Sequence, residues 1–189
     1  MLRFLSFALA AALLTTACGD DDDAVSITEE QLVGTWTVES ADNSVRLSTN
    51  GVNTLSSTGQ TETSDATVTF DADGTFTSSG VVAFTQTTTN AGISVPSGDA
   101  SVRFGRGSWS LDGTTVTLSD GGFLPDLGVV AAFVSVDAVG GDAEVTAFEP
   151  GARLTLVSRV DTTIVQDNPI GGPSISLRVE GEQTTVLTQ

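Results

Sequence analysis

The chain has 189 residues, of which 24 are Asp or Glu and only 7 are basic, so its formal net charge is −17. Every basic residue is arginine, and the sequence contains no histidine and no lysine. Such a surface repels nucleic acid, because no basic patch can displace the counterions of the phosphates. The missing residue types exclude Ser-His-Asp and Cys-His catalysis, histidine zinc sites and Schiff-base chemistry. A single cysteine also excludes an internal disulfide.

The N-terminus has the layout of a secretory signal peptide. Arg3 gives a positive start, residues 4–14 form an apolar stretch, and residues 15–17 are small residues that precede Cys18. The apolar stretch is much shorter than the ~20 residues that a membrane-spanning helix needs. The pattern therefore predicts a cleaved signal peptide over residues 1–17.

The small residues before Cys18 resemble the lipobox of bacterial lipoproteins, although Thr15 stands where that motif usually has leucine. The resemblance implies that Cys18 is lipidated, by palmitate among other acyl chains, and anchors the protein to the outer membrane. The alternative is an ordinary cleaved signal. Residues 18–28, with four adjacent aspartates at 20–23, are expected to form an acidic tether. The aspartates resemble an export signal of surface lipoproteins, so the cell surface and the periplasmic face both stay open.

Residues 29–189 are expected to form one β-domain. Val and Thr, which favour strands, are abundant, and apolar residues recur at every second position. This period is typical of antiparallel strands with one buried face. The alternating segments are residues 32–38, 66–70, 115–118, 153–164 and 175–180. Their spacing predicts an all-β sandwich or barrel of roughly eight to ten strands.

Turn signals separate several of these strands. Asp-Gly pairs predict hairpins at residues 71–74 and 112–113, and Pro-Gly predicts a turn at 149–152. Residues 180–182 predict a last hairpin. Residues 43–65, rich in Ser, Thr, Asn and Gly, are expected to be a loop with at most one poor strand. The apolar residues 121–141 leave three alternatives open: a buried strand, a short helix, or a flap over a cavity.

The first strand carries Gly34-x-Trp36, which resembles the opening motif of lipocalins. Residues 67–76, 107–118 and 153–157 follow in the order found in small bacterial lipocalin-like lipoproteins. The resemblance covers most of residues 31–160. It implies a lipocalin-like up-and-down barrel of about eight to ten strands, which can hold one small apolar ligand.

The motif has a physical reading of its own. Glycine lets a neighbouring segment approach closely, and the tryptophan two places later plugs one end of the barrel. Gly107 and Trp109 repeat this arrangement. The resemblance also places an arginine over the first tryptophan, for which Arg178 is the candidate. The candidate ligand-lining residues are Trp36, Val38, Phe70, Phe76, Trp109 and Leu156.

Few residues suggest other chemistry. Asp71 and Asp73 could contribute to a calcium loop, but further ligands and the distal Glu of an EF-hand are missing, so a hairpin turn is favoured. Arg103 and Arg106 could recognise a carboxylate or simply pair with acidic neighbours. Carboxylate-only catalysis such as glycoside hydrolysis stays open in principle, but the sequence marks no pair.

We therefore expect a lipid-anchored, lipocalin-like envelope protein that binds a small hydrophobic ligand. We expect it to have no enzymatic activity, cofactor, metal or nucleic-acid partner. The alternative is a structural or interaction β-domain on the cell surface that has no small-molecule ligand and meets another envelope protein.

Overall fold

The structure is a computed structural model that describes residues 25–90, 93–102, 105–119, 141–166 and 174–189. The apolar segment at residues 121–140 lies outside these ranges. The described elements are one helical turn and eleven strands, joined in a single antiparallel sheet. They are α1 (Glu29–Leu32), β1 (Gly34–Thr49), β2 (Val52–Ser64), β3 (Thr67–Phe70), β4 (Thr75–Ser79), β5 (Val82–Asn90), β6 (Ile93–Val102), β7 (Arg106–Asp112), β8 (Thr115–Leu118), β9 (Asp142–Glu149), β10 (Arg153–Gln166) and β11 (Ile175–Thr188).

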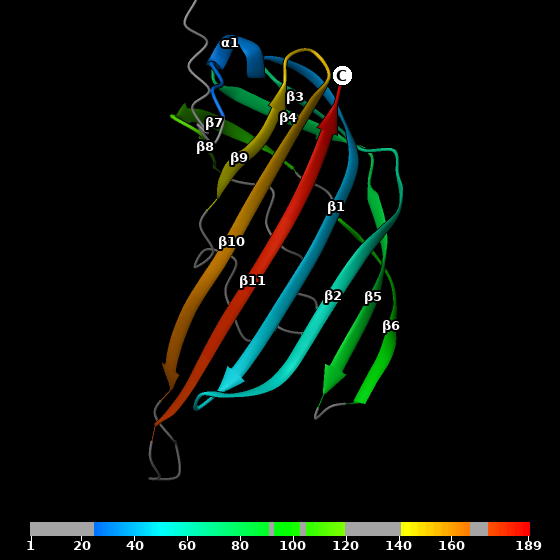
Figure 1. Ribbon diagram of the computed structural model, residues 1–189, viewed down its shortest axis with the longest axis vertical. Helices are drawn as coiled ribbons and strands as arrows, with labels where there is room; N and C mark the ends of the chain where they lie inside the picture. The colour runs from blue at the N-terminus through cyan, green and yellow to red at the C-terminus, as the bar shows by residue number, and fades with distance from the viewer. Residues whose placement is uncertain (1–24, 91–92, 103–104, 120–140, 167–173) are drawn as a thin grey trace, which may run out of the picture.

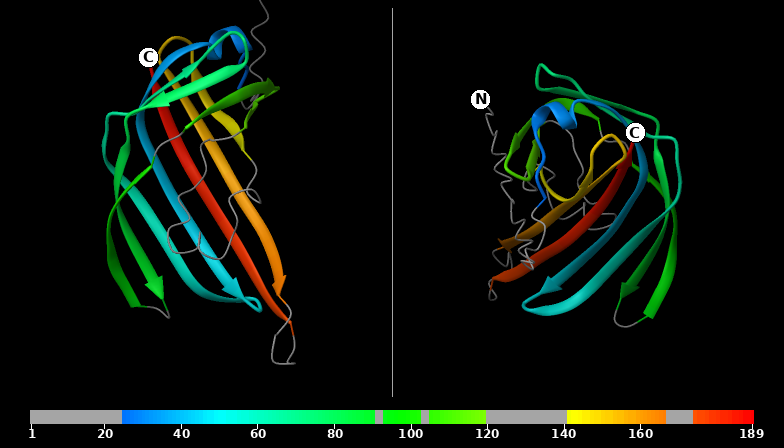
Figure 2. Two further views of the ribbon diagram at one scale, coloured as in Figure 1. Left: turned by 180° about the vertical axis from the view of Figure 1, so that it is seen from behind. Right: turned by 45° about the horizontal axis from the view of Figure 1, so that its top comes forward.

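Eight of the strands close into a ring. The order runs β11-β10-β9-β8-β7-β4-β3-β1, and β1 pairs with β11 to complete the circle. The right-hand view of Figure 2 looks toward this closed end, and α1 lies across it at the top of Figure 1. The prediction of an all-β antiparallel barrel with lipocalin-like architecture is confirmed.

The other three strands extend one side of the barrel downward. The start of β1 (34–37) pairs with β3, whereas its continuation (43–49) pairs with β2, which is followed in the sheet by β5 and β6. β1, β10 and β11 run through both halves. In the lower half, β6 does not pair with β10 among the described strands, so this half is splayed rather than closed (Figure 1). We call the two halves the closed end and the splayed end.

A corner between Asp65 and Val81 separates the two halves. The Asp65 amide donates to the Val81 oxygen (3.2 Å), and the Val81 amide donates to Asp65 Oδ1 (2.7 Å). Gly80 between β4 and β5 has a φ of +74°, and a Cβ there would lie 2.4 Å from the Asp65 carbonyl oxygen. Only glycine fits this approach. The chain therefore bends at the same level on its way from β2 to β3 and from β4 to β5.

The predicted turns at 71–74, 112–113 and 149–152 are confirmed. Gly74, Gly113 and Gly151 all have positive φ, as these turns require. The Gly74 amide donates to the Asp71 oxygen at 3.1 Å, and the Ala152 amide donates to the Glu149 oxygen at 3.0 Å.

Two predictions about the strands are wrong. Residues 43–65 are not a loop, because β1 continues to Thr49 and β2 fills most of the remainder. Residues 180–182 are not a hairpin, because β11 runs unbroken through Gly181, which pairs with Val45 and Val160. A Cβ at Gly181 would lie 2.8 Å from Val160 Cγ1, so this glycine serves the packing of a neighbour rather than a turn.

Candidate ligand-binding interior

The closed end is filled by one buried cluster beneath α1. Trp36 is fully buried, and its indole Nε1 donates to the Leu32 carbonyl oxygen at the end of α1 (2.8 Å). Ile27, which precedes the helical turn, is buried in the same cluster. Gly34 has a φ of +139°, a conformation that a residue with a Cβ rarely adopts. The Gly-x-Trp pair therefore lets the chain enter β1 and fastens α1 over the end of the barrel.

The second Gly-x-Trp pair acts in the same way on β7. A Cβ on Gly107 would lie 1.9 Å from the Ser119 carbonyl oxygen, so the close approach requires glycine. Trp109 Nε1 donates to the Asp71 carbonyl oxygen (3.0 Å) in the β3–β4 turn. The Trp109 ring meets Phe70 edge-on, with centroids 5.5 Å apart. Trp36 thus joins β1 to α1, and Trp109 joins β7 to the β3–β4 turn.

All six predicted lining residues lie in this one cluster. They are buried, from 0% exposure at Trp36 to 7% at Trp109, and they come from five different strands. The structure therefore brings together Trp36, Val38, Phe70, Phe76, Trp109 and Leu156.

A second apolar cluster occupies the inner face of the splayed end. It comprises the buried Val45, Leu47, Val160 and Val179, with the partly buried Leu55, Leu177 and Ile164 packed against them. Sequence reasoning placed Val160, Ile164, Leu177 and Val179 on alternating strands. The sequence did not predict the members of this cluster on β1 and β2, because residues 43–65 were expected to be a loop.

A row of buried polar residues separates the two apolar clusters. Asn43 on β1 pairs across the sheet with Gly59 on one side and with Gln183 on the other. The row continues from Gly59 to Gln86 on β5 and from Gln183 to Ser158 on β10. We call these five residues the polar belt. Asn43, Gln86, Ser158 and Gln183 are all less than one-tenth exposed.

The Asn43 carboxamide has an unusual place in the belt. It is 6% exposed, and neither its Oδ1 nor its Nδ2 has a hydrogen-bond partner among the described residues. A Cβ on Gly59 would lie 2.8 Å from Asn43 Nδ2, so the carboxamide lies over the glycine. Gln183 instead donates from Nε2 to Thr185 Oγ1 (3.1 Å). Buried polar groups without partners are rare in folded proteins.

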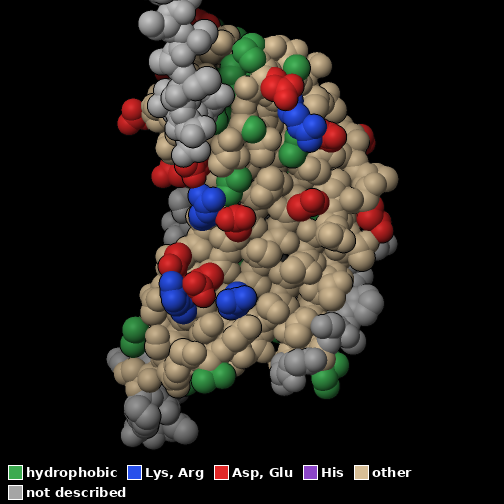
Figure 3. Space-filling view, viewed as in Figure 1, with side chains coloured by type: hydrophobic (Ala, Val, Ile, Leu, Met, Phe, Trp, Pro, Cys, Tyr) green, Lys and Arg blue, Asp and Glu red, His purple; other side chains and the backbone are tan. Residues whose placement is uncertain are grey.

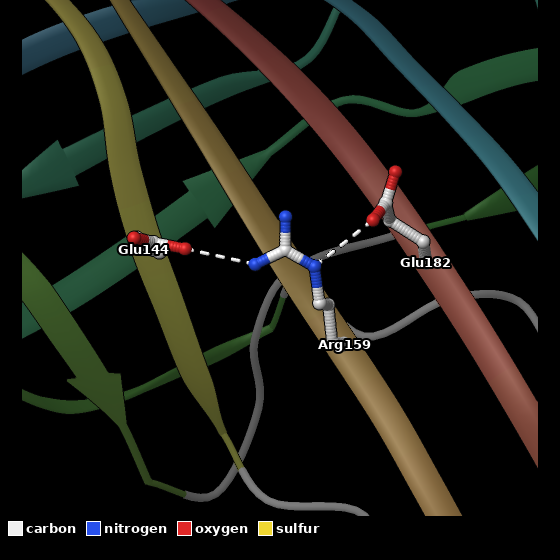
Figure 4. A network of polar contacts seen from close by, with 3 residues as sticks. All are labelled: Glu144, Arg159 and Glu182. Atoms are coloured by element: carbon white, nitrogen blue, oxygen red, sulfur yellow. Dashed lines mark hydrogen bonds and ion pairs between the residues drawn. The ribbon is translucent and has the colours of Figure 1, made fainter.

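The outer face carries the charges. Charged side chains of both signs lie interspersed over β1, β10 and β11 (Figure 3). Arg159 bridges three strands: its Nη1 contacts Glu144 on β9 (2.8 Å), and its Nε contacts Glu182 on β11 (2.9 Å; Figure 4). The hydrogen bonds to Glu144 and then Glu182 raise the pKa of Arg159 above its ordinary value. About half of each side chain is exposed, so the network contributes little to stability.

The predicted role of Arg178 is wrong. Its guanidinium lies on the outer face and binds Asp161 through two hydrogen bonds, of 2.9 and 2.6 Å, while Trp36 faces inward. These bonds hold the pKa of Asp161 below its ordinary value and raise the pKa of Arg178. Alternation along β11 decides the outcome, because the even-numbered position 178 faces away from the inward Val179.

The remaining chemical candidates do not come together in one place among the described residues. Asp73 Oδ1 accepts from the Thr75 amide and hydroxyl, as a hairpin turn requires. No group of three or more potential metal ligands occurs among the described residues. Arg106 is exposed, and Arg103 and Cys18 lie outside the described ranges. No helix in the described ranges is both long and apolar enough to cross a membrane.

The class that the fold defines is an antiparallel β-barrel of lipocalin-like architecture with one closed and one splayed end. Comparison with known proteins gives no further identity: no family model matches the chain, and no curated protein matches it either.

Proposed function

We propose that the protein is a lipid-anchored, lipocalin-like envelope protein that binds a small apolar molecule inside its barrel, with no catalytic role. The observation that carries the proposal is the inner face of the splayed end. That face carries its own apolar cluster, separate from the aromatic cluster of the closed end. Ligand sites in proteins are concave, mostly apolar and supplied with a few polar groups. The polar belt next to this cluster fits that description.

Membrane attachment would place this interior near a source of apolar molecules. The support is the sequence alone: a signal-like N-terminus that ends at Cys18, the only cysteine. Labelling cells with radioactive palmitate should mark the wild-type protein in the membrane fraction. A Cys18→Ser variant should be unlabelled and soluble. Equal membrane association of both would refute the anchor while leaving the binding proposal intact.

The binding proposal is tested by native mass spectrometry on protein purified from the host that makes it, followed by solvent extraction. We expect one small apolar molecule per chain. A chain that carries no molecule, and takes up none when incubated with a membrane lipid extract, would refute binding.

A specific feature of the outer face favours the second candidate, an interaction domain. A hollow of about 430 Å³ lies there between β1, β2, β10 and β11, lined by exposed side chains that include Arg46 and Glu182. A protein partner could dock against it. Crosslinking in intact cells that yields one stable partner, together with an empty barrel, would select this function.

A further inference from the structure

The large apolar side chains that are most exposed in the described ranges all lie at one end of the molecule. They are Val52, Ile93 and Val165, with exposed fractions of 65%, 69% and 65%. Val52 begins β2, Ile93 begins β6, and Val165 is the last residue but one of β10. All three positions are strand ends of the splayed end, at the bottom of Figure 1. We call the strand ends that carry these three residues the rim.

The rim is almost free of charge, although the chain has a net charge of −17. Residues 47–61 and 80–98 contain no charged residue, and residues 162–177 contain only Asp167. On the face that Figure 3 shows, the charged side chains end above the lower edge of the molecule. Because a charge is costly to remove from water, a surface without charges is suited to contact with an apolar phase.

The charged residues nearest the rim leave one arginine without a partner. Arg178 contacts both Asp161 (2.6 Å) and Glu180 (3.2 Å), so these three side chains together carry one negative charge. Arg46 lies opposite Glu180 in the sheet, but its side chain has no ion pair or hydrogen bond among the described residues. The four side chains are therefore neutral as a group, and the Arg46 guanidinium is available to an external anion.

A hollow of about 420 Å³ lies on the outer face beside the rim. Its lining includes Arg46, Arg178 and the hydroxyl groups of Ser48 and Thr163, all of which donate hydrogen bonds to phosphate oxygens. Arg46 is three residues, or about 10 Å, from the end of β1, where the chain turns toward Val52. This distance is comparable with the thickness of the headgroup layer of a bilayer.

A lipid bilayer fits the rim better than a folded partner does. The three apolar side chains come from separate strand ends, and among the described strands the sheet is open here between β6 and β10. A protein interface has one packed apolar core, whereas a fluid lipid surface closes around separate side chains. The bilayer also supplies the phosphate for Arg46. Zwitterionic lipids suit the chain best, because its net charge repels anionic headgroups.

We propose that the rim docks onto a zwitterionic phospholipid surface, with Val52, Ile93 and Val165 at the boundary of the acyl chains and a lipid phosphate bound to Arg46. This contact goes beyond the proposed function, because it requires neither a ligand in the barrel nor an acyl chain on Cys18. Val25 packs against the cluster of the closed end, so an anchor at Cys18 would leave the barrel opposite the rim. The rim of an anchored chain would then face a second lipid surface.

The test uses residues 19–189, which contain every described residue and no cysteine, mixed with phosphatidylcholine vesicles. When the vesicles are floated, about half of the protein should accompany them at about 1 mM lipid, because three aliphatic side chains hold a protein less tightly than one myristoyl chain. Val52→Asp should weaken this binding about tenfold, because its carboxylate loses water on docking. Thr77→Asp adds the same charge at an exposed position of β4 and should leave the binding unchanged.

Two further comparisons locate the contact. Arg46→Gln should weaken binding about threefold, because the phosphate loses its charged donor. Arg153→Gln removes the same charge from an exposed position at the closed end and should have no effect. An environment-sensitive fluorophore attached to Ile93→Cys should shift its emission to the blue when vesicles are added. The same fluorophore on Thr77→Cys should not respond.

Three results would overturn the inference. The unchanged chain does not float even with about tenfold more lipid than the association requires. Alternatively, Val52→Asp and Thr77→Asp float equally well, which would place the contact elsewhere. In the third case, the chain stays off the vesicles and sediments as a dimer that Val52→Asp dissociates, so that the rim joins two copies of the chain. The proposed ligand in the barrel is tested separately and survives any of these results.

Discussion

At the scale of single residues, the two tryptophans do similar work in different surroundings. Both donate their indole N–H to a backbone oxygen in a segment that covers the closed end. Trp36 is fully buried and holds α1, whereas Trp109 is slightly exposed and holds an exposed turn. The oxygen freed at Asp71 can bind water, but the oxygen of the buried Leu32 has less access to it. The two hydrogen bonds should therefore differ in their effect on stability.

We expect Trp36→Phe to lower the free energy of unfolding by about 3 kcal/mol, because it combines a cavity with an unpaired backbone oxygen. Trp109→Phe should cost only about 1 kcal/mol. Urea unfolding measures both, and because the chain has just two tryptophans, the one that remains reports by fluorescence. Equal losses of unfolding free energy in the two variants would show that the hydrogen bond to α1 contributes no more to stability than the one to the β3–β4 turn.

At the scale of elements, the ion pairs on the outer face connect neighbouring strands. Arg178 on β11 binds Asp161 on β10 and lowers the pKa of that carboxyl group. A carboxyl group with a lowered pKa in the folded state holds its proton less tightly there than in the unfolded chain. Its contribution to stability is therefore present above the unfolded pKa of about 3.9 and is lost as the pH falls through the lower folded value.

This sign gives a prediction for Asp161→Asn. At pH 7 the variant should be less stable than the wild type, by a small amount because the pair is exposed. The gap should narrow below about pH 4 and then close. Urea midpoints measured from pH 7 down to pH 3 test it, and Arg178→Gln should show the same closing gap. A gap that stays constant with pH would mean that the ion pair is not its cause.

The sequence predicts those turns and strands that depend on residues close together in the chain. The Asp-Gly and Pro-Gly turns depend on a few adjacent residues, and strands such as β10 show their alternation because Leu154 and Leu156 face the closed end. Residues 43–65 give only a short signal, at Val45 and Leu47. Their inward positions include Asn43, Ser57 and Gly59, so a strand that is buried on one face has the composition of a loop.

The candidate site was predictable only in part for the same reason. The aromatic cluster at the closed end follows from the Gly-x-Trp pairs, because large apolar residues in strands are usually buried. The polar belt depends on the register between β2, β1 and β11, which places Gly59, Asn43 and Gln183 side by side. No local pattern encodes that register. Gly181 was misread because a glycine that accommodates Val160 has the same sequence signature as a turn glycine.

At the scale of the whole molecule, the two ends differ in whether the sheet has edges. Each strand of the ring has a neighbour on both sides. In the splayed end, β6 is the last strand of the described sheet, and β10 beyond Ser158 pairs only with β11 among the described strands. Pro96 in β6 lacks an amide hydrogen, which suits an edge strand and discourages pairing with another chain.

This difference should appear in the rates at which backbone amides exchange with deuterium. A ring cannot fray from an edge, so its amides exchange with deuterium only when the whole barrel unfolds, whereas an edge strand can detach alone. Amides of β3, β4 and β10 around Val68, Phe76 and Leu154 should therefore exchange orders of magnitude more slowly than those of β6. Uniform exchange rates in both halves would contradict this. If the rates differ as expected, the splayed half opens and recloses many times within the lifetime of the ring, and a bound molecule can leave without the protein unfolding.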